Sequence, residues 1–237
     1  MTFVNSRGFV VRLTACILMS LFVTGCASYR VSTSLQPKKL AAPMPADVQF
    51  RVAAVSFVAP TNVTGGGLSA FGPYQPSNEE VRNLLMASAM KAYPKVFSEE
   101  PTAVPIEVTI TRSAYTMDLG GECCASCLTL TILPARSTDK TEYTVQVQVK
   151  EGLASETLAA PVSFSREDTS WLSIWPTGWV PVPGGKGDRA WGQDSAIQKG
   201  GELTLSSCVE AVVTAIRRVD VETWQKIRPT GVPDEKK

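Results

Sequence analysis

The chain has 237 residues, with 23 Lys or Arg against 22 Asp or Glu, and it contains no histidine. This near balance argues against a nucleic-acid-binding protein, which would show a basic face and a high pI. The missing histidine excludes Ser-His-Asp and Cys-His catalysis as well as His-ligated zinc. With 44% hydrophobic residues, the chain can bury the core of one domain. We therefore expect a globular protein that is not an enzyme and binds no cofactor.

The first 25 residues have the layout of an export signal. Arg7 and Arg12 give a positive start, and Leu13 to Val23 is an apolar stretch of 11 residues. A helix needs roughly 20 residues to cross a bilayer, so this stretch is too short for a retained anchor. Val23-Thr24-Gly25-Cys26 follows and resembles the lipobox of bacterial lipoproteins. The resemblance implies cleavage before Cys26 and acylation of that cysteine with diacylglycerol and palmitate.

A lipobox also implies a location. In the enterobacterial sorting rule an aspartate after the cysteine retains a lipoprotein on the inner membrane, whereas this chain has Ala27 and Ser28. The resemblance therefore implies a lipid-anchored protein of the outer membrane with its domain facing the periplasm. Removing residues 1–25 takes away two arginines and no acid, which leaves a net charge of about −1 on the mature chain. The alternative is an ordinary secretory signal that is cleaved nearby, for example after Ala27.

The region after the anchor divides into a tether and a domain. Residues 26–46 contain the lipidated cysteine and a mixture of Ser, Pro, Ala and Lys without apolar periodicity, which predicts a flexible tether. Residues 47–227 are expected to form one domain. Val48 to Ala59 opens it as a strand whose apolar end is typical of a central strand covered on both faces. Pro60 ends this strand, and a Gly-rich loop continues to Pro76.

A helix is predicted next, because Ser77 and Glu80 form a capping box and apolar residues then recur at helical spacing. Pro94 places its end near Tyr93. Residues 106–117 alternate between apolar and polar and predict a half-buried strand. The order strand, helix, strand predicts a β-α-β unit at the start of the domain.

Consecutive strands are predicted in the second half. After the Gly120-Gly121 turn they cover 128–133, 143–149 and 160–164, and the last two form a hairpin. The valine stripe of 143–149 needs a helix to cover it. Its alternation also allows a membrane-spanning hairpin, which would require oligomerisation into a pore.

A second helix is predicted over 205–219, with Ser207 and Glu210 as a possible capping box. Residues 228–237 are expected to be a disordered tail. The fold class predicted for the whole is α+β: a mixed or mainly antiparallel sheet of about five strands packed against two helices.

Four cysteines remain in the predicted mature domain besides Cys26, in an oxidising compartment that favours disulfides. They are Cys123, Cys124, Cys127 and Cys208. A 123–124 bridge would be strained, so the plausible pairings join Cys208 to one of the other three. Two further hypotheses are a redox site, since 124–127 has C-x-x-C spacing, and a four-cysteine metal site.

The segment from Thr169 to Gly185 is 17 residues long and carries no charge. It contains Trp171, Trp175 and Trp179, and tryptophan is favoured both at membrane interfaces and at protein–protein contacts. Three interpretations remain open: a loop that closes the core, a surface for a protein partner, and a membrane contact. Asp188, Arg189 and Trp191 follow as a solvated continuation.

The order of elements behind an acylated cysteine loosely resembles small α/β envelope lipoproteins, such as the penicillin-binding-protein activators and the curli-secretion lipoprotein. No motif carries functional residues of either family over to this chain. The leading hypothesis is a non-catalytic binding or scaffolding lipoprotein that contacts another envelope protein in envelope assembly or transport. The alternatives are a periplasmic redox or metal-binding protein that uses the cysteine cluster, and a subunit of an oligomeric secretion pore.

Overall fold

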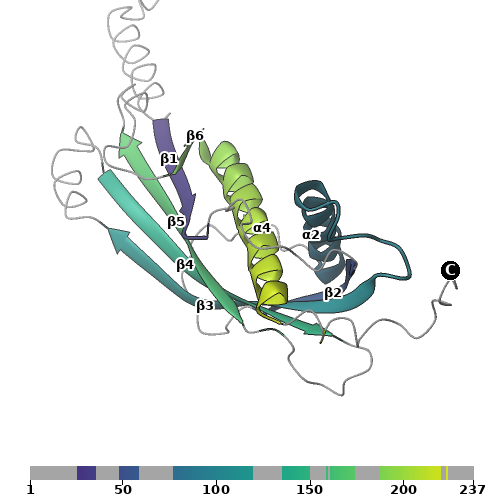
Figure 1. Ribbon diagram of the computed structural model, residues 1–237. Coiled ribbons are helices and arrows are strands. Elements are labelled where there is room, and N and C mark those ends of the chain that lie inside the picture. Colours follow the sequence, from purple (N-terminus) through teal and green to yellow (C-terminus); the bar gives the residue numbers. More distant parts are fainter. Residues whose placement is uncertain are drawn as a thin grey trace, which may run out of the picture.

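The structure is a computed structural model that describes residues 26–35, 48–58, 77–119, 135–149, 159, 161–173, 187–219 and 223. One face of a six-stranded sheet is covered by two helices, and the sheet curls around the longer helix (Figure 1). The helices are α2 (Asn78–Ala92) and α4 (Gln193–Arg218). The strands are β1 (Cys26–Thr33), β2 (Phe50–Val58), β3 (Val104–Leu119), β4 (Ala135–Val149), β5 (Val162–Ser173) and β6 (Asp188–Trp191).

The sheet is mixed, with the strand order β2-β3-β4-β5-β1-β6. Strands β2 and β3 are parallel and α2 connects them, which confirms the predicted β-α-β unit. All other neighbours are antiparallel, so the α+β fold class is also confirmed, with six strands where about five were expected. The prediction that β2 is a central strand was wrong. It lies at the sheet edge, and its apolar side chains are buried under α2 on one face only.

The flexible tether predicted for residues 26–46 was wrong at its beginning. Residues 26–33 form β1, which pairs with β5 on one side and with β6 on the other. Val31 is buried in the sheet, and the backbone N–H of Ser34 donates to the carbonyl of Ser165 at 2.8 Å. Polar residues such as Ser28, Ser32 and Thr33 give this strand no apolar pattern in the sequence. Its stability comes from pairing with two distant strands.

Strand β6 lies where a solvated continuation was expected, and a glycine permits its close approach to β1. Gly187 has a φ of +105°, and a Cβ there would lie 2.2 Å from the carbonyl oxygen of Val31. Only glycine fits this conformation and this contact. The register then aligns Arg30 with Arg189 and Ser28 with Trp191.

Helix α2 begins as predicted. The hydroxyl of Ser77 accepts a hydrogen bond from the backbone N–H of Glu80, and the Glu80 carboxylate accepts from the N–H of Ser77. The helix ends at Ala92, one residue before its C-cap Tyr93. The Tyr93 hydroxyl bonds the buried Glu210 of α4, which ties the two helices together. Because Tyr93 is half-buried beside a carboxylate, its pKa lies well above the ordinary value.

Helix α4 is longer than predicted, and the expected capping box at its start was wrong. It begins at Gln193, twelve residues before the predicted start, and Gly192 is its N-cap. Ser207 lies fully buried in the middle of α4, and its hydroxyl donates to the carbonyl of Leu35. The sequence did not predict residues 193–204 as helical, because they contain the pair Gly200-Gly201 and glycine disfavours helix interiors.

A single apolar core lies between the sheet and the two helices. The valine stripe of β4 faces α4 and is fully buried, which confirms that a helix covers it. Tyr143 stacks on Phe164 of β5 with ring centroids 5.1 Å apart. The signal segment 1–25, the strand predicted at 128–133 and the tail 228–237 lie outside the described residues. The largest buried apolar side chains are Tyr143, Phe50, Phe97, Leu85, Met86, Ile106 and Ile216.

Candidate functional site

The predicted acylation site is the first residue of β1. Cys26 pairs with Ser173 at the end of β5, and Ser28 pairs with Trp171. The same end of the sheet contains the beginning of β4 and the end of β3, because Ala135 pairs with Leu172 and Leu119 pairs with Ser137. Four strands therefore terminate together where the lipid is expected, and we call this region the Cys26 end of the sheet.

The outer face of the Cys26 end, opposite the helices, carries cations close to an aromatic side chain. Residues that pair across antiparallel strands point to the same face, so Arg136, Trp171 and Ser28 form one row. The next row contains Thr138, Thr169, Arg30 and Arg189, and Asp118 of β3 joins it opposite Thr138. Arg189 is exposed, while Arg136, Arg30 and Trp171 are half-buried. These two rows therefore hold three cations and one acid.

Trp171 belongs to a strand, not to a loop folded over the sheet. It lies in β5, between Arg136 of β4 and Ser28 of β1. Trp175 and Trp179, the other two tryptophans of the candidate contact segment, lie outside the described residues. Trp171 and Cys26 are 145 positions apart in the sequence. The structure brings Trp171 opposite Ser28, two residues from Cys26.

The helix side of the sheet contains a buried ion pair that the sequence analysis missed. Arg166 is 1% exposed, and its guanidinium binds the Asp168 carboxylate through Nε to Oδ1 at 3.0 Å and Nη2 to Oδ2 at 2.8 Å. Burial raises the pKa of Asp168, while the charge of Arg166 opposes this rise. The signal in the sequence was the i, i+2 spacing of opposite charges in a strand, which places both on one face.

Helix α4 has a glycine where this guanidinium lies. A Cβ on Gly200 would come within 2.2 Å of Arg166 Nη2 and 2.6 Å of its Cζ. One turn later Thr204 contacts the same group, since Arg166 Nη1 donates to the Thr204 hydroxyl at 3.4 Å. That hydroxyl in turn donates to the carbonyl of Gly200 at 2.7 Å. Gly200 therefore makes room for a buried arginine between the helix and the sheet.

A polar network extends from this pair toward the Cys26 end. Asp139 pairs with Asp168 in the register of β4 and β5, and its carboxylate accepts a hydrogen bond from the Tyr115 hydroxyl at 3.0 Å. Burial and this bond raise the pKa of Tyr115 to about 12. The guanidinium of Arg112 lies 5.1 Å from the ring centroid of Tyr115. The network holds β3, β4 and β5 together, because Tyr115, Asp139 and Asp168 come from these three strands.

Cys208 is a free thiol in the structure, and the predicted disulfide between it and another cysteine is not formed. It lies on the face of α4 that packs against the core, and it is 3% exposed. Burial raises the pKa of its thiol to about 12, the opposite of the shift that activates a catalytic cysteine. Cys123, Cys124 and Cys127 lie outside the described residues.

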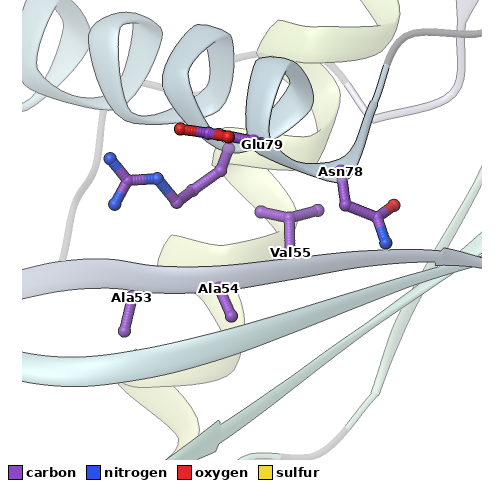
Figure 2. A pocket seen from close by; sticks show the side chains of 6 residues that line it. Ala53, Ala54, Val55, Asn78 and Glu79 are labelled. Carbon is purple, nitrogen blue, oxygen red and sulfur yellow. The ribbon is translucent and has the colours of Figure 1, made fainter.

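A shallow pocket of about 390 Å³ lies between β2 and the first turn of α2 (Figure 2). Val55 points from the strand toward the helix, and Asn78 reaches from the helix toward the strand. The Asn78 side chain accepts a hydrogen bond from the N–H of Phe57, and the Arg82 guanidinium is bonded to Asn83. Asn78 and Arg82 are thus engaged by neighbours, and Glu79 is exposed. Its lining residues are Ala53, Ala54, Val55, Asn78, Glu79 and Arg82.

Two further properties of the described residues concern metal binding and membrane-spanning helices. Within those ranges, no three side chains of the metal-binding types cluster closely enough to hold an ion. Neither described helix is long and apolar enough to cross a membrane.

Comparison with known proteins gives a distant likeness only. No family model matches the chain, and no curated protein matches it. Among solved structures, a dodecamer of a PelC variant from Paraburkholderia phytofirmans is similar at 11% identity and a TM-score of 0.27, over 77% of this chain and 98% of that chain. A minor lipoprotein from Acinetobacter baumannii is similar at 11% identity and a TM-score of 0.22, over 76% of this chain and 96% of that chain. Scores this low assign no function.

Proposed function

We propose that this protein is a bacterial lipoprotein of the outer membrane that works as a non-catalytic binding or scaffolding protein on the periplasmic side. The observation that carries the proposal is the position of Cys26. The lipobox-like sequence predicts cleavage before this residue, and β1 begins at the same residue. Processing there keeps all of β1 in the mature chain, where it pairs with β5 and β6.

A non-catalytic role is supported by the chemistry of the buried groups. The chain has no histidine. The side chains whose pKa values depart most from the ordinary ones pack between strands and helices. Tyr143, for example, is stacked in the core, where burial raises its pKa to about 12. Arg166 and Asp168 neutralise each other between α4 and the sheet. A binding protein needs a stable scaffold of this kind, with its contacts on the surface.

The surface proposed for a protein partner is the part of the uncharged segment that follows β5 in the chain and contains Trp175 and Trp179. Tryptophan supplies much of the binding energy at protein contacts, because it buries a large area with little loss of side-chain freedom.

Acylation is tested by growth with labelled palmitate. We expect label on the parent protein and on Cys16→Ser, whose substitution lies within the signal segment, but not on Cys26→Ser. Label on Cys26→Ser would contradict the anchor.

Partner binding is tested by crosslinking the natively acylated protein and purifying it. We expect a defined envelope protein that is lost from Trp175→Ala and Trp179→Ala and kept by Trp224→Ala, which lies outside the segment. Recovery of the same protein from all three variants would contradict the proposed surface.

The redox hypothesis is tested separately by alkylation of the native protein followed by peptide mass analysis. A thiol with a pKa of about 12 is protonated at neutral pH, so we expect Cys208 to react only after unfolding. Rapid labelling of Cys208 in the folded protein would favour the redox hypothesis over the scaffolding proposal.

A further inference from the structure

We propose that the Cys26 end of the sheet lies directly on the membrane surface and that its outer face binds the phosphate groups of lipids. This inference rests on the proposed acylation of Cys26 and adds an orientation to it. The lipid would be attached to a residue that already pairs with Ser173 of β5. Since β1 begins at that residue, no flexible segment separates the acyl chains from the sheet. The domain therefore cannot swing away from the bilayer as a tethered domain would.

Distances along the strand place the aromatic row within the headgroup layer. A strand rises about 3.4 Å per residue, so the row of Ser28, Trp171 and Arg136 lies about 7 Å from Cys26. The headgroup layer on each side of a bilayer is about 5 to 8 Å thick. Any tilt of β1 brings this row still closer to the surface. Trp171 then has the location that tryptophan favours, between hydrocarbon and water.

The charges of the outer face complement a phosphate surface. Arg136 lies in the row at about 7 Å, and Arg30 and Arg189 lie in the next row at about 14 Å. Asp118 is the acid of these rows, so their formal charge is +2, and one of the cations, Arg30, already donates to the carbonyl of Gly187. Further from Cys26 the acids outnumber the cations, because Lys140 is bonded to Glu142 at 3.0 Å and also pairs with Glu167. The cationic excess is therefore confined to the part of the face closest to the proposed lipid.

The test uses the acylated full-length protein in vesicles of equal parts phosphatidylglycerol and phosphatidylethanolamine, with and without lipids brominated on the acyl chains. Bromine quenches tryptophan fluorescence on contact, so we expect strong quenching in the parent and a measurable loss of it in Trp171→Phe. An Arg near an anionic surface contributes about fivefold to surface binding. Arg136→Glu and Arg189→Glu should each weaken the contact of the outer face with the lipid headgroups by at least that factor and so reduce quenching.

The control is Lys95→Glu, an exposed cation after α2, beside the start of β2 at the opposite end of the sheet. It should leave quenching unchanged. Arg189 is exposed, so its reversal should keep the parental circular dichroism spectrum even if Arg136→Glu does not.

The two proposals fail in different ways. Absence of acyl mass on Cys26 overturns the anchor itself. Acylated protein whose tryptophans are not quenched, or whose quenching is the same in Arg189→Glu and Lys95→Glu, overturns the membrane-facing orientation and leaves the face to a protein partner.

Discussion

At the scale of single residues, the buried arginine of β5 requires a residue without a side chain in the facing turn of α4. Arg166 needs Asp168 for its charge and Gly200 for its volume. Each of these residues is unusual in isolation: an arginine that is fully buried, an aspartate with a raised pKa, and a glycine inside a helix. Together they form one satisfied contact between helix and sheet.

Gly200→Ala should destabilise the protein although alanine is the better helix former. The new Cβ would lie 2.2 Å from Nη2 of a guanidinium that cannot leave the core. Overpacking of this kind costs about 1–3 kcal/mol, more than the gain of about 1 kcal/mol in helix propensity. Urea unfolding measures the difference, with Gly201→Ala as the neighbouring control that should gain stability. Equal gains in both variants would contradict the packing argument.

Arg166→Met should cost about 3–5 kcal/mol near neutral pH, because it leaves the Asp168 carboxylate buried without its counter-charge. The pKa of Asp168 is already raised by burial and should rise further in this variant. A raised pKa means that the folded state holds the proton more tightly than the unfolded state. The penalty should therefore shrink as pH falls through the raised pKa.

Unfolding in urea from about pH 7 to about pH 4 tests this dependence. The double variant Arg166→Met with Asp168→Asn should lose it, since no carboxyl remains at the site. A penalty in Arg166→Met that stays constant over this range would show that lost packing, and not the charge, is its cause.

At the scale of elements, the sequence predicted the helices and strands that contacts between neighbouring residues stabilise. Helix α2 begins at the predicted capping box, and β3 follows its alternating pattern. Strand β1 and the first half of α4 have no comparable signal. Both depend on partners far away in the chain: β1 pairs with β5, and Gly200 in the first half of α4 packs against Arg166.

Ser77→Ala should cost about 0.5–2 kcal/mol, because the N–H of Glu80 loses its acceptor and the capping box is broken. Ser88→Ala, in the middle of the same helix, should be neutral or slightly stabilising, since alanine favours the helix interior. Thermal unfolding of both variants provides the comparison. Equal stability of the two variants would mean that the cap contributes nothing to α2.

At the scale of the whole molecule, the incorporation of β1 makes the mature N-terminus part of the fold. A chain of residues 26–237 should fold and unfold cooperatively. A chain of residues 36–237 should lose β1 and leave β5 and β6 without the strand between them. We expect the shorter chain to lose its cooperative urea transition, as followed by circular dichroism. Equal stability of the two chains would restore the tether prediction.

The sequence alone determined the features that depend on short stretches of chain. These are the predicted anchor at Cys26, the absence of histidine chemistry, the cap of α2, the β-α-β unit and the α+β class. Only the tertiary structure placed Cys26 beside Trp171, buried Arg166 against Gly200, and turned a predicted tether into an inner strand. The physical reason is that pairing and burial between distant segments stabilise conformations that local composition does not favour, so their energy is absent from any short window of sequence.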